Sequence, residues 1–174
     1  MWTILVRNLL RRPVTMRGPA ALAGDLDMKA RQKLGRSLSI RQIDAGSCNG
    51  CELEIHALNN PLYNIEQLGI RFVASPRHAD LLLITGPVTR NMEAALRRTY
   101  DATPDPKLVV ALGDCGCTGG IYGENYASCG RVSNVIPVNV AVPGCPPSPQ
   151  RILAGILAAF TSTPSPHPRA GASP

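Results

Sequence analysis

Four cysteines, each in a short turn-forming segment, constrain the fold of this chain more than any other feature. Cys48 and Cys51 form a Cys-x-x-Cys pair, Cys115 follows Gly-Asp, and Cys145 lies in a Pro-Gly-Cys-Pro-Pro segment. Four thiolates carried on separate loops can surround one iron-sulfur cluster when the fold brings those loops together. The long gaps between the cysteines therefore predict an electron-transfer site assembled by a whole domain.

Apolar runs alternate with helical patterns along most of the chain. Five short runs predict β-strands, at residues 39–43, 70–73, 80–86, 107–113 and 138–142. Helical patterns occur at 51–58, 89–100 and 148–161. Short strands that are almost wholly apolar are typical of a parallel sheet covered on both faces. We therefore expect an α/β fold with a central parallel sheet and right-handed crossovers.

The cysteines fall directly after three of these predicted strands. Cys48 and Cys51 follow the first strand, Cys115 follows the strand at 107–113, and Cys145 follows the strand at 138–142. Because the carboxyl ends of parallel strands meet at one edge of a sheet, we expect the four thiols to converge there. The surrounding glycines leave room for a bulky inorganic group and expose N–H groups to it.

Two other kinds of cysteine site remain open on this evidence. A Cys-x-x-Cys between a strand and a helix also serves thiol-disulfide oxidoreductases, although such a mechanism leaves Cys115 and Cys145 unused. Structural zinc also takes four thiolates, but zinc modules usually pair two short Cys-x-x-Cys segments across a modest loop. The spacing here favours the iron-sulfur interpretation over both.

The two remaining cysteines are not expected among the ligands. Cys117 follows Cys115 by two residues, too close for both side chains to reach one iron, so we interpret it as a spare thiol or a group near the cluster. Cys129 is expected to be a buried core cysteine, the common fate of a free thiol. His56 and His78 have no metal-ligand spacing to other residues and are interpreted as ordinary histidines.

Two acidic residues next to the ligand pair are candidates for proton coupling. Glu52 and Glu54 follow Cys51 directly, and negative charge arriving on a neighbouring cluster would raise the pKa of their carboxyl groups. The alternative is that they stabilise the N-terminus of the following helix, where acidic side chains are favoured.

The positive charge of the chain is concentrated near its N-terminus. The net charge is +6, and residues 1–41 hold 9 Lys/Arg against 2 Asp/Glu, whereas the rest holds 9 against 10. Without interleaved aromatic residues or a binding motif, this pattern does not indicate nucleic acid. Residues 1–12 predict a short basic amphipathic helix that would lie on a membrane surface or pack on a neighbouring subunit.

The predicted organisation has three parts. Residues 1–38 are expected to form a basic N-terminal helix and arm, 39–162 the folded domain, and 163–174 a disordered tail rich in Pro, Ser and Ala. No apolar run approaches the roughly 20 residues of a membrane span. The Arg11-Arg12 pair precedes Pro13 and no apolar segment, so no export signal is expected and the protein is interpreted as cytoplasmic.

An ordered series of motifs resembles the small subunit of group 4 membrane-bound [NiFe]-hydrogenases, the formate hydrogenlyase type, and the related 20 kDa subunit of respiratory complex I. The similarity covers roughly residues 39–160. The motifs are Gly46-Ser-Cys-Asn-Gly-Cys-Glu-Leu-Glu-Ile55, Ser75-Pro-Arg-His-Ala-Asp80, Thr85-Gly-Pro-Val-Thr-Arg90, Pro104-Asp-Pro-Lys107, Gly113-Asp-Cys115 and Pro143-Gly-Cys-Pro-Pro147.

This resemblance implies a flavodoxin-like three-layer domain that holds one [4Fe-4S] cluster through Cys48, Cys51, Cys115 and Cys145. The nickel centre would belong to another polypeptide, so this chain would be a non-catalytic subunit with no small-molecule substrate of its own. It would relay electrons between a hydrogenase-like large subunit and a ferredoxin-like iron-sulfur subunit. With membrane subunits, these would form a complex that holds the chain on the cytoplasmic side of the membrane as a peripheral subunit.

One departure distinguishes the two branches of the resemblance. Complex I subunits carry two adjacent cysteines at the first ligand position, whereas Cys48 and Cys51 are spaced as in the hydrogenases. The chain also lacks the cysteine-rich C-terminal part of uptake hydrogenase small subunits, so no further clusters are expected. A quinone-reducing subunit of the complex I type, or a complex whose large subunit has no nickel, remains the alternative.

Overall fold

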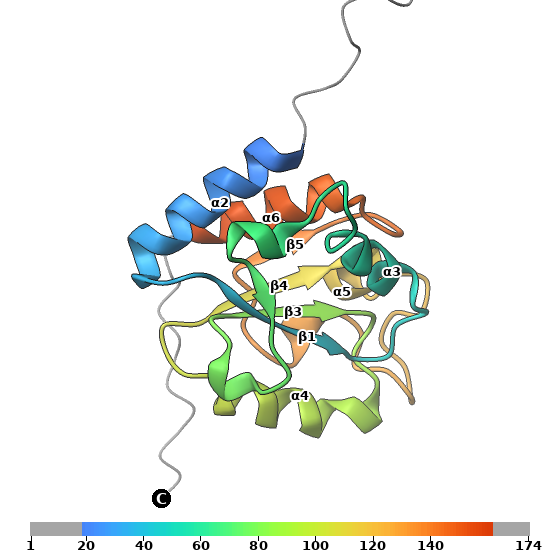
Figure 1. Cartoon of the computed structure of the whole chain (residues 1–174). Helices are drawn as coiled ribbons and strands as arrows, with labels where there is room; N and C mark the ends of the chain where they lie inside the picture. The colour runs from blue at the N-terminus through green and yellow to red at the C-terminus, as the bar shows by residue number, and fades with distance from the viewer. Residues whose placement is uncertain (1–18, 162–174) are drawn as a thin grey trace, which may run out of the picture.

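A five-stranded, wholly parallel sheet forms the centre of the domain (Figure 1). The computed structural model describes residues 19–161, with side chains from residue 24 onward. The strands are β1 (Ser39–Asp44), β2 (Arg71–Phe72), β3 (Leu81–Thr85), β4 (Leu108–Leu112) and β5 (Val140–Val142). Their spatial order is β2-β1-β3-β4-β5, which is the flavodoxin-like order. The predicted α/β class and parallel sheet are confirmed.

Helices cover both faces of this sheet. The α-helices are α2 (Pro19–Leu34), α3 (Gly50–Ala57), α4 (Arg90–Ala102), α5 (Gly113–Thr118) and α6 (Pro149–Thr161). Short 3₁₀ turns are η1 (Ile65–Leu68), η2 (Pro76–His78) and η3 (Val132–Asn134). Helices α2, α3 and α6 lie on one face and α4 lies on the other (Figure 1). The fold therefore has the three layers that the resemblance implied.

The two central strands are buried on both sides, as their apolar sequences predict. Along β3, Leu81 and Leu83 pack into the core beneath α2 and α6, whereas Leu82 and Ile84 pack into the core beneath α4. Strand β4 alternates in the same way. Successive side chains of a strand point to opposite faces, so one apolar run supplies both cores.

Helix α2 differs from the arm expected at residues 1–38. The sequence of this helix carries one narrow apolar stripe, at Leu26, Ala30 and Leu34, among many polar residues, which is a weak signal for a packed helix. Leu26 and Ala30 are nonetheless fully buried, in the core cluster that also contains residues of α6. The folded unit therefore extends N-terminally beyond residue 39.

The predicted N-terminal helix at residues 1–12 and the predicted tail at 163–174 lie outside the described residues. Within the described part, none of the helices combines the length and apolar character that crossing a bilayer requires.

Candidate functional site

The carboxyl ends of four strands lie in register at one edge of the sheet. Asp44 is the cross-strand neighbour of Thr85, Thr85 of Leu112, and Leu112 of Val142. The loops that leave these residues therefore start along one line. They line a small cavity that opens to solvent.

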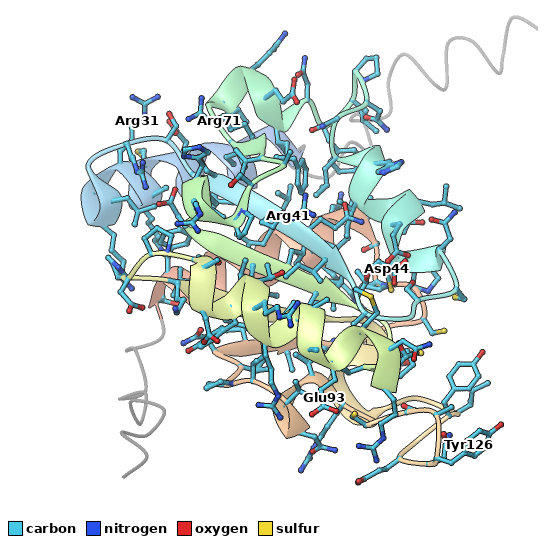
Figure 2. All side chains as sticks on the ribbon, turned by 90° about the horizontal axis from the view of Figure 1, so that it is seen from below. Arg31, Arg41, Asp44, Arg71, Glu93 and Tyr126 are labelled. Carbon is cyan, nitrogen blue, oxygen red and sulfur yellow. The ribbon has the colours of Figure 1, made fainter. Side chains whose placement is uncertain are left out.

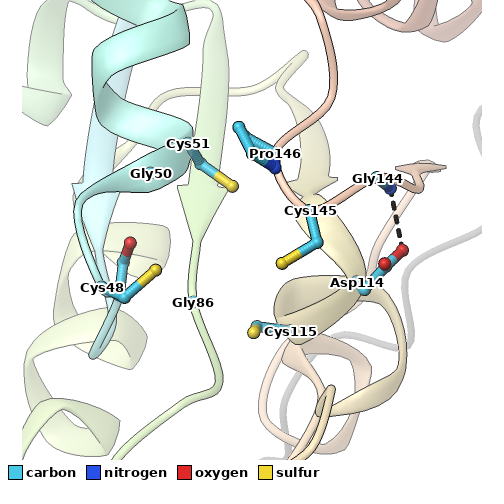
Figure 3. Close-up of a pocket in the computed structure, with 10 residues that line it drawn as sticks. Cys48, Gly50, Cys51, Gly86, Asp114, Cys115, Gly144, Cys145 and Pro146 are labelled. Atoms are coloured by element: carbon cyan, nitrogen blue, oxygen red, sulfur yellow. Dashed lines mark hydrogen bonds between the residues drawn. The ribbon is translucent and has the colours of Figure 1, made fainter.

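All four predicted cysteine ligands line this cavity (Figure 3). Cys48 and Cys51 approach from the β1–α3 loop and the first turn of α3, Cys115 from α5, and Cys145 from the loop after β5. The other lining residues are Ser47, Gly50, Gly86, Asp114, Gly144 and Pro146. The structure thus brings together the four thiols that the sequence singled out.

The first cysteine loop is held by a carboxylate at the end of β1. Asp44 Oδ1 accepts hydrogen bonds from the backbone N–H groups of Gly46 at 2.8 Å and Ser47 at 2.7 Å. Asn49 then adopts a left-handed conformation, with φ of 70°, directly before α3 begins at Gly50. This turn reverses the chain and leaves Cys48 exposed and Cys51 half-buried.

Glu52 also holds the loop that carries Cys48, through hydrogen bonds with Ser47 and Thr85. Its side chain is buried, and Oε2 accepts a hydrogen bond of 2.6 Å from Ser47 Oγ. The Thr85 hydroxyl, at the end of β3, bonds to the other carboxylate oxygen. Neither Glu52 nor the partly exposed Glu54 is among the residues that line the cavity. Glu52 lies in the first turn of α3, as the alternative interpretation expected, and proton coupling by either residue stays a prediction.

Cys115 lies in a short helix that the sequence did not indicate. Residues 113–118 include two glycines and were expected to form a loop, but they form α5. The backbone N–H of Asp114 donates to Gly144 O at 2.9 Å, and Asp114 Oδ1 accepts from Gly144 N–H at 2.8 Å (Figure 3). This reciprocal pair joins the Cys115 helix to the Cys145 loop.

Two glycines leave the space that the thiols occupy. A Cβ atom at Gly113, where φ is +81°, would lie 2.6 Å from Cys51 Sγ. A Cβ atom at Gly120 would lie 2.8 Å from Cys115 Sγ. Both distances are shorter than real contacts, so any larger residue would displace a predicted ligand. These two glycines therefore leave room for the thiols, and the expected exposure of N–H groups to a bound inorganic group stays a prediction.

The thiols are electrostatically unfavourable as a group of anions. Burial raises the pKa of Cys51 to about 12, and the charges of Glu52 and of the other three cysteines add to the effect. Burial also raises the pKa of Cys115, followed by the charges of Cys145 and Cys48. Burial and the neighbouring charges therefore favour the neutral thiol form of Cys51 and Cys115 when no positive centre is near.

The four cavity thiols are soft donors, of the kind that bind zinc and iron-sulfur centres. Within the described part of the chain, no three His, Cys, Asp or Glu side chains are grouped closely enough to hold one metal ion.

The remaining two cysteines lie away from the cavity. Cys117 is half-buried, its Sγ is 3.6 Å from Ala111 O, and burial raises its pKa to about 11. Cys129 is buried, as predicted, and its Sγ is 3.3 Å from Glu93 Oε2. His56 and His78 are exposed. The residue that the sequence interpretation missed is Asp114, because nothing local identifies Gly144 as its partner.

Comparison with known proteins agrees with this arrangement. The family described as NADH ubiquinone oxidoreductase, 20 kDa subunit, matches residues 48–159. Formate hydrogenlyase subunit 7 of Escherichia coli K12 is 44% identical over 150 residues, which are 85% of this chain and 58% of that protein. The probable membrane-bound hydrogenase subunit mbhJ of Pyrococcus furiosus is 45% identical over 127 residues, 73% of this chain and 76% of that protein.

A solved structure extends the similarity to three dimensions. The membrane-bound sulfane sulfur reductase, an archaeal respiratory membrane complex, contains a chain that aligns with a TM-score of 0.64 at 34% identity. The alignment covers 79% of this chain and 74% of that one. The family match includes all four cavity cysteines and extends into α6. The chain belongs to the family of the 20 kDa subunit of NADH ubiquinone oxidoreductase.

Proposed function

We propose that this chain is an electron-transfer subunit that carries one [4Fe-4S] cluster on Cys48, Cys51, Cys115 and Cys145. The observation that carries the proposal is the convergence of these four thiols, from three strand-end loops, on one cavity. A cluster of this kind accepts and releases single electrons when bound. The contribution of the chain is to hold the four ligands and to set the charge and hydrogen bonding around them.

The relatives and the exposed surface support the proposed partners. We propose a hydrogenase-like large subunit, a ferredoxin-like iron-sulfur subunit and membrane subunits, with the chain peripheral on the cytoplasmic side. The loop that follows α5 supports a protein partner, because Ile121 is 93% and Tyr126 is 96% exposed. Figure 2 shows Tyr126 on a loop that projects from the domain. Exposed aromatic residues on a fixed loop are typical of protein interfaces.

That loop is anchored at its base, so its tip is presented in a defined position. Cys129 N–H donates to Val88 O at 2.7 Å, and Val88 N–H donates to Gly130 O at 2.9 Å. Asn125 Oδ1 accepts from the N–H groups of Ala127 and Ser128. A pre-organised loop loses less conformational freedom on binding a partner.

The alternatives are weaker in this geometry. A quinone-reducing subunit of the complex I type would carry the same cluster, but the spaced Cys48 and Cys51 favour the hydrogenase branch. A thiol-disulfide oxidoreductase needs a thiolate with a lowered pKa, and burial disfavours Cys51 in that role because it raises the pKa of this thiol to about 12. A thiol-disulfide mechanism on Cys48 and Cys51 would also leave Cys115 and Cys145 without a role.

Anaerobic reconstitution of the full chain tests the proposal. We expect about four iron and four sulfide per chain, with a broad visible absorption that bleaches on reduction. Cys145→Ser should lose or destabilise the cluster, whereas the matched control Cys117→Ser should retain it, because Cys117 lies outside the cavity. Zinc binding without iron, or an unchanged cluster in Cys145→Ser, would contradict the proposed ligand set.

A further inference from the structure

Asp114 connects two of the proposed ligand loops through both its backbone and its side chain. Its N–H bonds to Gly144 O, and its carboxylate bonds to Gly144 N–H at 2.8 Å. Asp114 directly precedes Cys115, and Gly144 directly precedes Cys145. The pair therefore fixes the relative position of two cysteines that lie 30 residues apart in the sequence.

Asp114 is also one of the residues that line the cavity, and its carboxylate forms no ion pair with any residue that the structure describes. No Lys, Arg or His is among the lining residues. Two further carboxylates, on Asp44 and Glu52, hold the loop on the opposite side. Among the residues that the structure describes, none of these three acids forms an ion pair.

Negative charge beside a redox centre opposes the arrival of an electron. Coulomb interactions are strong at short range where a wall of protein excludes water. Cluster potentials depend on net charge and on hydrogen bonding near the sulfur atoms. An acid without a cationic partner at the cavity wall therefore stabilises the oxidised form and lowers the reduction potential.

We infer that Asp114 is a positioning residue that joins the Cys115 and Cys145 loops, and that its negative charge lowers the reduction potential of the centre they hold. The inference rests on the proposed function, because it assumes a redox centre in the cavity. No local sequence pattern indicates this role for Asp114, since its partner Gly144 is distant in the chain.

Two substitutions separate the charge from the hydrogen bond. Asp114→Asn keeps an oxygen that can accept from Gly144 N–H but removes the charge, so the reconstituted full chain should retain its iron and show a higher reduction potential. Asp114→Ala removes both, so the Gly144 amide of the full chain should exchange with deuterium about 10- to 100-fold faster than in the wild type. Asp101→Asn, an exposed acid at the end of α4, is the matched control for loss of one negative charge.

Each result decides one part of the inference. A potential in Asp114→Asn that moves no further than in Asp101→Asn would overturn the role of the charge. An unchanged exchange rate of the Gly144 amide in Asp114→Ala would overturn the positioning role. If wild-type protein takes up no iron, the proposed function fails, and the exchange measurement still decides whether Asp114 holds the two loops.

Discussion

The two edges of the sheet use aspartate in opposite ways. At the amino edge, Asp80 is buried, accepts from Ser39 N–H at 3.0 Å and pairs with Arg36 at 2.6 Å. At the carboxyl edge, Asp44 and Asp114 accept hydrogen bonds from loop N–H groups and have no ion-pair partner among the described residues. At the amino edge the charge of Asp80 is balanced by Arg36. At the carboxyl edge no ion pair among the described residues balances the charges of Asp44 and Asp114.

This difference separates stability from function within one fold. A paired, buried acid contributes to folding whether or not a ligand is present. Loops held by carboxylates beside four thiols concentrate negative charge, which is favourable only when a positive centre balances it. Substitutions at the two edges should therefore affect different measurements.

The largest effect is expected at the carboxyl edge, from Gly113→Ala. The new Cβ would lie 2.6 Å from Cys51 Sγ, so one ligand must move, and iron retention after reconstitution should fall several-fold. Gly123→Ala is the matched control, because Gly123 also has a positive φ, of +56°, but a Cβ there meets nothing within 4 Å. Equal iron content in the two variants would show that crowding at Cys51 does not matter.

An intermediate effect is expected at the amino edge, from Asp80→Ala. This change leaves Ser39 N–H without its acceptor and removes the partner of Arg36, so the free energy of unfolding should fall by about 1–3 kcal/mol. Urea unfolding measures it, with Asp101→Ala as the exposed control. Iron content per folded chain should stay at the wild-type value. A loss of iron as large as in Gly113→Ala would remove the distinction between the edges.

The smallest effect is expected at Glu93, in the first turn of α4. The hydrogen bond from Cys129, then that from Arg97, lowers the pKa of the Glu93 carboxyl group. The ionised Glu93 side chain therefore stabilises the fold at pH values above its pKa in the unfolded chain. This stabilisation is lost as the pH falls through the lower pKa that Glu93 has in the folded protein. Glu93→Gln should slightly lower the Tm at pH 7, and the difference from wild type should vanish in acid. A difference that stays the same at every pH down to acid unfolding would contradict this assignment.

Local patterns in the sequence were sufficient for most of the fold. The apolar runs of β3 and β4 identify buried strands, and the turn residues after β1, β4 and β5 place the cysteines at one edge. Helix α2 was underestimated because its apolar stripe is narrow, and α5 was missed because glycines are poor helix formers. Both are stabilised by contacts with distant segments.

The sequence identified the four proposed ligands but not the hydrogen bonds that hold their loops in place. Cys48, Cys51, Cys115 and Cys145 follow from residue type and strand position. The contacts of Asp114 with Gly144 and of Glu52 with Thr85 join segments about 30 residues apart, and no local pattern encodes them. Such contacts depend on strand order, which the sequence does not state directly.

The position of each strand in the sheet has a consequence for how a bound cluster would be lost. The three proposed ligand loops follow strands that are not held equally firmly in the sheet. Strands β1 and β4 each pair with a neighbour on both sides, whereas β5 has three residues and is an edge strand. Edge strands unfold locally more readily than central strands, and such local unfolding costs far less free energy than unfolding of the whole domain. If a cluster is held there, Cys145 would be the first ligand to detach, so the cluster would be lost while the chain is still folded and ageing preparations would contain folded but colourless protein.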